Sequence, residues 1–127
     1  QDSSSAASDV YKRQSNNKII LHSWTGGNKW TKKFAELGVY FSISGIVTYE
    51  TAQDLQLAVN NIPLNKILIE TDIPYLAPEP YKGQKNKPSY IMYTAEKISK
   101  ILDVSLNEFS ELTKENTDRL LSRDLNE

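Results

Sequence analysis

The sequence of 127 residues contains no cysteine, which excludes disulfide bonds and thiolate metal sites. It also lacks any apolar run near the roughly 20 residues that a membrane span requires, and no signal peptide is visible. With 15 basic and 16 acidic side chains the net charge is −1, so nucleic-acid binding would require a local basic patch. We therefore expect a soluble, cytoplasmic protein without a membrane partner.

The chain begins with Gln and its single methionine is Met92, so we do not expect its first residue to be a natural start. The first fourteen residues, QDSSSAASDVYKRQ, are rich in Ser and Ala and contain two sizeable apolar side chains, Val10 and Tyr11. They cannot bury enough surface to become ordered, and they resemble translated adapter sequence from environmental gene models. We expect residues 1–17 to be a non-native or disordered leader and residues 18–127 to form the domain. A native disordered tail is the alternative.

From Lys18 onward, short apolar runs alternate with segments of helical periodicity. We predict strands over residues 18–24, 39–45 and 66–72, and helices over 28–37, 51–61, 89–102 and after Ser105. Pro63 ends the second helix, and Ser105 with Glu108 forms a capping box for the last one. Strands and helices that alternate with short connections are typical of parallel βαβ units. The sequence therefore predicts an α/β domain.

Polar residues follow the first and third predicted strands. In parallel α/β folds, chemistry collects at the C-terminal ends of the strands, and this rule selects His22 and Asp72. Strand alternation places Leu68, Glu70 and Asp72 on one face, so we expect both acids to point into the same space. An imidazole and a carboxylate that converge are suitable ligands for a divalent cation such as Zn²⁺, Mn²⁺ or Mg²⁺.

Two ligands do not complete a metal site, because catalytic zinc commonly has three protein ligands plus water and this chain contains one histidine. His22 could instead be a hydrogen-bonded structural residue, and Asp72 could be a turn residue before a proline. Glu70 could simply pair with a lysine. The residues alone thus indicate an α/β domain with a candidate metal site.

Four segments give a more specific indication. They are LHSWTGG (21–27), YFSISGIVTYE (40–50), IPLNKILIETDIPYLAPEPYKGQKNKPSY (62–90) and ENTDRLL (115–121). In this order they resemble the C-terminal half of the TatD family of metal-dependent deoxyribonucleases, and ETDxPYLAP followed by a basic turn and NxPxY is highly specific. The resemblance implies a partial TIM (β/α) barrel that comprises the last three β/α units of a metal-dependent hydrolase.

The resemblance also implies roles for individual residues. His22 is similar to the family's late-strand histidine ligand, and Asp72 is similar to the final-strand aspartate that binds metal and takes a proton from the attacking water. One or two divalent cations (Mg²⁺, Mn²⁺ or Zn²⁺) would serve the hydrolysis of phosphodiester bonds in DNA. Glu70 belongs to the same motif, and we expect it to orient the ligands rather than bind metal.

The loop over residues 81–88 adds a local basic group. Lys82, Lys85 and Lys87 could hold a phosphate backbone, and Tyr75 with neighbouring tyrosines could stack on the bases of a single strand. These four residues are our candidates for substrate binding. A solvated loop with buried tyrosines is the alternative.

The family's paired first-strand histidines, its metal-bridging glutamate and an earlier histidine have no counterpart in this sequence. We therefore expect the chain by itself to bind metal weakly and to be inactive or nearly so, and the intact protein to be a monomer that acts on DNA. Two alternatives remain. One is an amidohydrolase-like enzyme acting on a small ester, amide or lactone, and the other is a non-catalytic half-barrel that self-associates.

Overall fold

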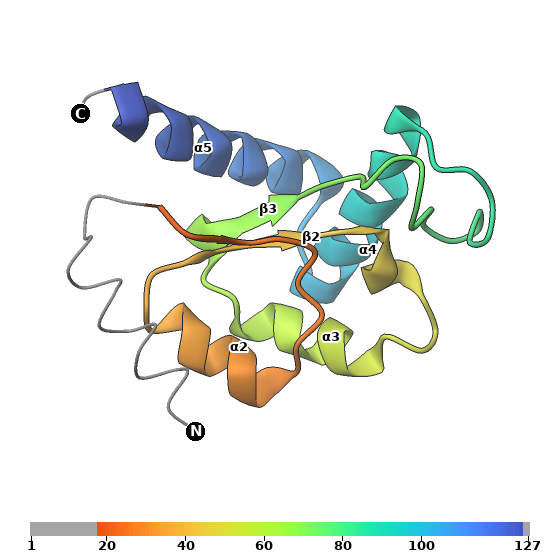
Figure 1. Cartoon of the computed structure of the whole chain (residues 1–127), viewed down its shortest axis with the longest axis horizontal. Coiled ribbons are helices and arrows are strands. Elements are labelled where there is room, and N and C mark those ends of the chain that lie inside the picture. Colours follow the sequence, from red (N-terminus) through yellow and green to blue (C-terminus); the bar gives the residue numbers. More distant parts are fainter. Residues whose placement is uncertain (1–17, 126–127) are drawn as a thin grey trace.

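Three short apolar segments form a parallel sheet in the computed structural model, which describes residues 18–125 (Figure 1). The strands are β1 (Ile20–Leu21), β2 (Tyr40–Ile43) and β3 (Ile67–Ile69), in the order β1-β2-β3. Phe41 of β2 pairs with Leu21 on one side and with Ile67 on the other. Each strand is shorter than predicted, and the prediction of an α/β domain with parallel strands is confirmed. The predicted leader, residues 1–17, lies outside the described residues.

Helices connect and flank these strands. The α-helices in the described part of the chain are α2 (Asn28–Ala35), α3 (Gln53–Ala58), α4 (Ile91–Leu102) and α5 (Leu106–Leu125). Short 3-10 turns are formed by η1 (Gly45–Thr48), η2 (Val59–Asn61), η3 (Leu64–Lys66) and η4 (Pro88–Tyr90). The helix predicted over residues 51–61 is therefore divided between α3 and η2. Between residues 18 and 125, no helix is both long and apolar enough to cross a membrane.

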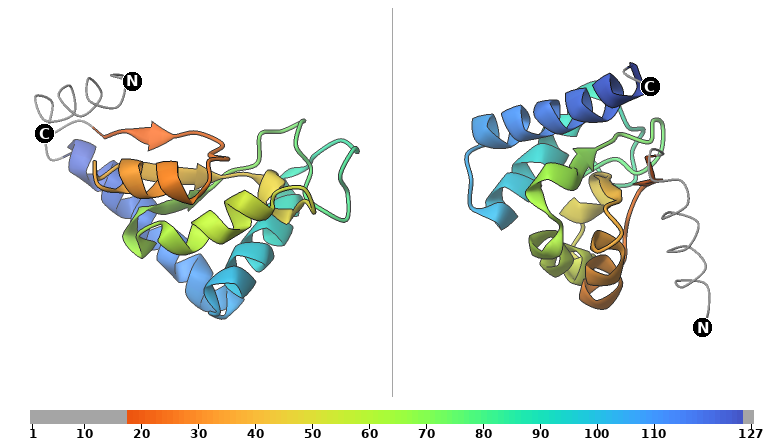
Figure 2. Two further views of the ribbon diagram at one scale, coloured as in Figure 1. Left: turned by 90° about the horizontal axis from the view of Figure 1, so that it is seen from below. Right: turned by 90° about the vertical axis from the view of Figure 1, so that its left-hand side faces the viewer.

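The two faces of the sheet are covered by different elements. Phe41 and Ile67 point into a large apolar core that also holds side chains of α3, α4 and the first part of α5. Tyr40 and Leu68 alternate to the other face and pack with Leu120 near the end of α5. Helix α5 runs along β3 on the side of the sheet away from α2 and α3 (Figures 1 and 2). Burial of each large apolar side chain stabilises this arrangement by about 1.5–3 kcal/mol.

The segment ENTDRLL contributes a buried asparagine that fixes the start of β3. Asn116 is fully buried, and its Nδ2 donates hydrogen bonds to the carbonyl oxygens of Leu64 and Ile67 at 2.8 and 2.9 Å. Arg119 donates to its Oδ1 at 3.0 Å. These bonds anchor the N-terminal end of β3.

The capping box predicted for the last helix is present at the start of α5. The backbone N–H of Ser105 donates to Oε1 of Glu108, and the backbone N–H of Glu108 donates to Oγ of Ser105, both at 3.0 Å. The backbone hydrogen bond from Ser105, aided by its hydroxyl, holds the pKa of the Glu108 carboxyl below its ordinary value. This local motif formed as its sequence predicted.

Candidate metal centre

Three polar side chains meet at the C-terminal edge of the sheet. His22 directly follows β1, Glu70 directly follows β3, and Asp72 lies two residues further along the chain. Ligand atoms of all three residues lie within 4.8 Å of one another. The structure therefore brings together His22 and Asp72, the two residues selected as candidate metal ligands, while their roles as ligands stay predictions.

The imidazole ring of His22 lies between the two carboxylates. Its Nδ1 is 2.6 Å from Oε2 of Glu70, and its Nε2 is 3.4 Å from Oδ1 of Asp72. The His22 side chain is 67% exposed, whereas Glu70 and Asp72 are 16% and 20% exposed. The imidazole is thus open to solvent, whereas the two carboxylates that flank it are largely buried.

Glu70 and Asp72 both approach the His22 ring, but the prediction that strand alternation brings them together was wrong. Strand β3 ends at Ile69, so strand alternation does not extend to Asp72. Asp72 has a left-handed backbone with φ 58°, a conformation that Asp adopts more readily than most residues. Ser23, which follows His22, is also left-handed with φ 49°. Such strained positions are typical of functional sites and cost about 1–3 kcal/mol each.

Glu70 is held by residues of the other two strands and their ends. Its Oε1 accepts hydrogen bonds from Oγ of Ser42 at 2.7 Å and from the backbone N–H of Ser23 at 3.2 Å. Its Oε2 is buried and accepts no aligned hydrogen bond among the described residues, so the close contact to His22 is its polar partner. Sequence reasoning missed Ser42, although alternation along β2 places it on the face that Glu70 occupies.

The chain beyond Asp72 is packed closely against η1. The Tyr49 hydroxyl donates to the carbonyl oxygen of Ala77 at 2.8 Å, and Thr48 Oγ1 accepts from the backbone N–H of Glu79 at 2.8 Å. A Cβ atom on Gly45 would lie 2.5 Å from the carbonyl oxygen of Leu76, so the close approach requires glycine. The PYLAP motif therefore follows a fixed path over η1.

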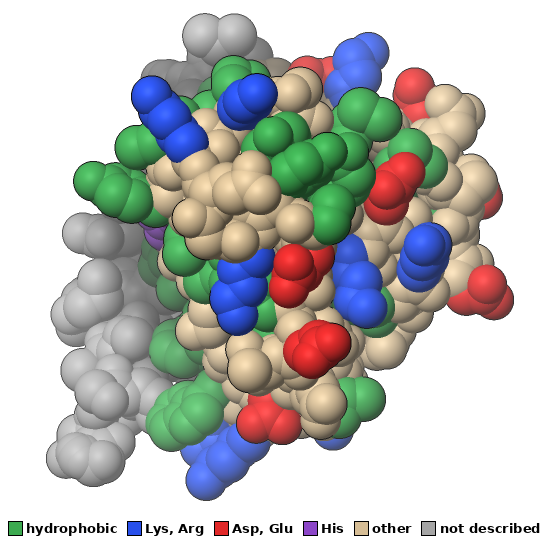
Figure 3. Space-filling model, turned by 90° about the vertical axis from the view of Figure 1, so that its right-hand side faces the viewer, with side chains coloured by type: hydrophobic (Ala, Val, Ile, Leu, Met, Phe, Trp, Pro, Cys, Tyr) green, Lys and Arg blue, Asp and Glu red, His purple; other side chains and the backbone are tan. Residues whose placement is uncertain are grey.

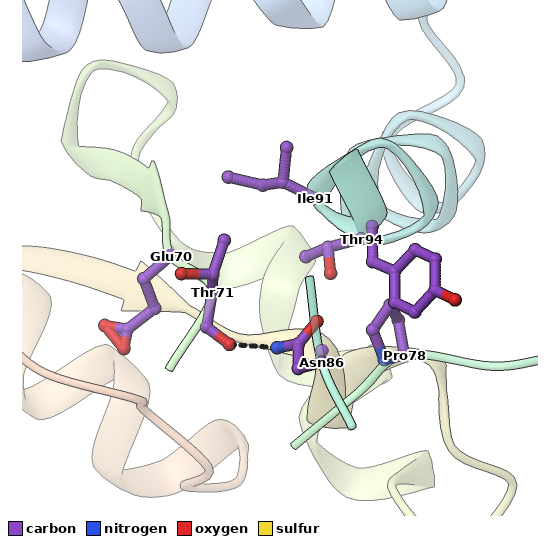
Figure 4. Close-up of a pocket in the computed structure, with 8 residues that line it drawn as sticks. Glu70, Thr71, Pro78, Asn86, Ile91 and Thr94 are labelled. Atoms are coloured by element: carbon purple, nitrogen blue, oxygen red, sulfur yellow. Dashed lines mark hydrogen bonds between the residues drawn. The ribbon is translucent and has the colours of Figure 1, made fainter. Parts of the chain in front are cut away.

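A buried asparagine holds the other side of the same loop. Asn86 lies beside Thr71 and Pro78, and Nδ2 of Asn86 donates to the carbonyl oxygen of Thr71 (Figure 4). The space that these residues enclose with Glu70 is too small to hold a ligand. Sequence reasoning recognised Asn86 only as part of the NxPxY pattern, because its partners are set by the path of the loop.

The predicted substrate-binding residues lie on the loop that projects beyond the ends of β2 and β3 (Figure 1). Tyr75 is 73% exposed, and its backbone N–H donates to the carbonyl oxygen of Asp72 at 2.7 Å, which places it next to the centre. Lys82, Lys85 and Lys87 are all exposed. Their roles in substrate binding stay predictions.

The neighbouring aromatic rings already have partners. Tyr81 and Tyr90 stack with centroids 4.2 Å apart, while Lys82 and Lys87 lie over the rings of Tyr49 and Tyr90 at 4.6 and 5.6 Å. Figure 3 shows basic and acidic side chains interspersed on this side of the molecule. Contact with a phosphate backbone would therefore depend on individual lysines rather than on a continuous basic surface.

One family model matches nearly the whole chain. The family model of TatD-related DNases matches residues 2–122. The uncharacterized metal-dependent hydrolase BU355 of Buchnera aphidicola is 41% identical over 99 residues, which are 78% of this chain and 38% of that protein. The uncharacterized metal-dependent hydrolase YcfH of Escherichia coli is 38% identical over 105 residues, covering 83% and 40%. The chain thus spans about two fifths of the length of these relatives.

Solved structures show the same fold. YJJV, a TatD homolog from Escherichia coli, superposes with a TM-score of 0.79 at 21% identity, covering 94% of this chain and 47% of that one. A TatD family hydrolase from Entamoeba histolytica gives 0.75 at 20% identity, with coverage of 94% and 48%. The assignment of the strands to the last three units of a barrel, and the domain boundary after residue 17, stay predictions.

Proposed function

Because the chain belongs to the TatD-related DNase family, we propose that its strand ends form part of a divalent-metal site for the hydrolysis of phosphodiester bonds in DNA. The observation that carries this proposal is the convergence of His22 and Asp72 beyond the ends of two strands in one parallel sheet. Parallel α/β folds place their chemistry at this edge.

The distances at the centre fit a metal ion. Two ligand atoms that each lie about 2.1 Å from one ion, at tetrahedral or octahedral angles, are roughly 3.0–3.4 Å apart. Nε2 of His22 and Oδ1 of Asp72 are 3.4 Å apart. A neutral imidazole and a carboxylate suit Zn²⁺ and Mn²⁺, and Mg²⁺ prefers oxygen ligands. His22 and Asp72 are therefore the residues that would hold the ion.

Glu70 fits a supporting role. A metal-binding histidine usually has its second ring nitrogen held by a carboxylate or carbonyl, which fixes the ring and the nitrogen that remains free. Oε2 of Glu70 lies against Nδ1 of His22, so Nε2 is the nitrogen turned toward Asp72. The bonds from Ser42 and Ser23 to Oε1 hold the Glu70 carboxylate in this orientation.

The proposed chemistry is attack of water on the phosphorus, which forms one P–O bond and breaks the P–O bond to a sugar oxygen, and that oxygen leaves as a hydroxyl after taking a proton from solvent. A bound divalent ion lowers the pKa of water and neutralises charge on the phosphate oxygens. Asp72, which is four-fifths buried, would accept the proton of the attacking water on its carboxylate. Tyr75, exposed beside Asp72, would stack on a base, and Lys82, Lys85 and Lys87 would contact phosphates.

Among residues 18–125, the candidate ligands that the fold brings together are few. Its single histidine and the Asp72 carboxylate provide two of the three or more protein ligands that catalytic metal sites commonly use. We therefore propose that the 127-residue polypeptide binds Mn²⁺ weakly and does not degrade DNA by itself. Mn²⁺-dependent release of nucleotides from single-stranded DNA by the purified chain, abolished by Asp72→Asn, would contradict this.

A chimera tests the function itself. The region of Escherichia coli YcfH that aligns with this chain is replaced by the matching residues of this chain, and the product is assayed on DNA with Mn²⁺. We expect metal-dependent hydrolysis that Asp72→Asn abolishes and that the exposed control Asp118→Asn leaves unchanged. A folded, Mn²⁺-binding chimera that cleaves a small ester or lactone but leaves DNA intact would instead favour an amidohydrolase-like substrate.

A further inference from the structure

Among the described residues, the turn that carries Asp72 accepts hydrogen bonds from one residue outside the turn, Asn86, which donates through both its side chain and its backbone N–H. Asn86 is 3% exposed, and its Nδ2 donates to the carbonyl oxygens of Thr71 at 2.5 Å and Tyr75 at 2.9 Å. Its backbone N–H donates to the carbonyl oxygen of Pro74 at 3.0 Å. Its Oδ1 accepts from the backbone N–H of Lys87 at 2.9 Å. The side-chain amide nitrogen and the backbone N–H of Asn86 therefore both donate hydrogen bonds to the turn.

These bonds reach the chain on both sides of Asp72, at Thr71 before it and at Pro74 and Tyr75 after it. Among the described residues, all hydrogen bonds that reach residues 71–75 from elsewhere in the chain come from Asn86. Within the turn, the backbone N–H of Tyr75 donates to the carbonyl oxygen of Asp72 at 2.7 Å. Strand β3 has already ended at Ile69, so no sheet pairing holds this segment.

We propose that Asn86 is a positioning residue for the metal centre. By fixing the carbonyls on both sides of Asp72, it stabilises the left-handed backbone that turns this carboxylate toward His22. The inference rests on the proposed function, in that Asp72 is taken as a metal ligand. Groups that orient a ligand without touching the ion usually cost 10–100-fold in metal affinity when removed.

A second buried asparagine provides a matched control at the opposite end of β3. Asn116 also donates through Nδ2 to two backbone carbonyls, those of Leu64 and Ile67. It is fully buried, and its Oδ1 also accepts a hydrogen bond. Replacement of either asparagine by alanine removes the same number of side-chain donor bonds, but only Asn86 contacts the turn that holds Asp72.

The experiment measures Mn²⁺ binding to the 127-residue chain by electron paramagnetic resonance, alongside thermal unfolding. We expect Asn86→Ala and Asn116→Ala both to lower the melting temperature, because each removes two hydrogen bonds from a buried side chain to backbone carbonyls. Asn86→Ala should weaken Mn²⁺ binding by about tenfold or more, and Asn116→Ala should leave it within about twofold of the original chain. Equal Mn²⁺ affinity in the two variants would overturn the proposal.

A second readout needs no metal. Hydrogen exchange at the Tyr75 amide reports the closed turn, and it should accelerate in Asn86→Ala beyond the change that lower global stability causes in Asn116→Ala. If the original chain and Asp72→Asn bind Mn²⁺ alike, the metal-site proposal fails, and Tyr75 exchange alone then decides the role of Asn86. Unchanged protection of Tyr75 in Asn86→Ala would contradict that role.

A second variant covers the case in which Asn86→Ala does not fold. Asn86→Asp keeps the shape and the acceptor for Lys87 but presents an oxygen to the carbonyls of Thr71 and Tyr75. Its added negative charge by itself favours a cation, so a loss of Mn²⁺ affinity would reflect displacement of Asp72. Asn116→Asp serves as the control, and Mn²⁺ affinity maintained in Asn86→Asp would count against the proposal.

Discussion

Glu70 contacts the Nδ1 edge of His22 at 2.6 Å, and the opposite edge of the same ring faces Asp72. Glu70 is itself bonded to Ser42 in β2 and to Ser23 after β1, so one carboxylate links the ends of all three strands. The orientation of the imidazole is therefore determined by the packing of the sheet.

Substitution of Glu70 separates an orienting role from ligation. In Glu70→Gln the side chain keeps its shape but loses the charge that faces Nδ1 of His22, and Mn²⁺ affinity should fall about 10–100-fold without being abolished. Electron paramagnetic resonance of free Mn²⁺ measures the change, with the exposed Glu115→Gln as control. Loss of binding as complete as in Asp72→Asn would identify Glu70 as a ligand.

Gly45 should not tolerate a larger side chain. A Cβ atom there would lie 2.5 Å from the carbonyl oxygen of Leu76 and 3.0 Å from the backbone nitrogen of Pro78, neither of which can move without shifting the loop. Gly45→Ala should lower the free energy of unfolding by about 1–3 kcal/mol, measured in urea. Gly27→Ala is the control, because its Cβ would meet Asp54 at an ordinary 3.9 Å. A loss of stability no larger than that of the control would argue against the close packing.

The capping box makes stability depend on pH. The bond from the Ser105 backbone lowers the pKa of Glu108, so its stabilisation is complete above the ordinary carboxyl pKa and is lost as the pH falls through the lowered folded-state value. The melting-temperature difference between the original chain and Glu108→Gln should therefore shrink from neutral pH to about pH 3. A difference that does not change with pH would rule out this charged cap.

Tyr75 should contribute to the binding of single-stranded DNA. Its ring is 73% exposed beside Asp72, and stacking on one base is worth about 1–3 kcal/mol. In the YcfH chimera, Tyr75→Ala should weaken binding of a fluorescent oligonucleotide, measured by anisotropy, by about 5-fold or more. Trp30→Ala removes another exposed aromatic ring, on α2, and should have little effect. If both variants bind equally well, Tyr75 is not a stacking platform.

The local features of this chain could be predicted from the sequence more fully than the distant contacts. The Ser105 and Glu108 cap depends on four consecutive positions, and it formed as predicted. The meeting of His22 with Asp72 followed from the rule that parallel strands place their C-terminal ends together. The left-handed turn at Asp72 could not be predicted, because it depends on the position of Asn86, fourteen residues later.

The ends of strands were the least predictable feature. The first predicted strand covered residues 18–24, whereas β1 is Ile20–Leu21. Ser23 adopts a left-handed conformation that interrupts the extended backbone, although the N–H of Trp24 still donates to the carbonyl oxygen of Ser42 in β2. The third ended at Ile69 rather than at residue 72, where the chain turns toward Asn86. In both cases, the regular strand ends before the polar residues of the candidate site, although those residues were included in the predicted strand.

The most direct test of the central claim is a Mn²⁺ titration of the 127-residue chain, with His22→Gln and Asp72→Asn as variants of the two proposed ligands. The account predicts weak, saturable binding at one site in the original chain, and loss of that binding in each variant while thermal unfolding shows that both remain folded. Mn²⁺ binding of equal affinity and stoichiometry in all three proteins would contradict the proposal that His22 and Asp72 hold the metal.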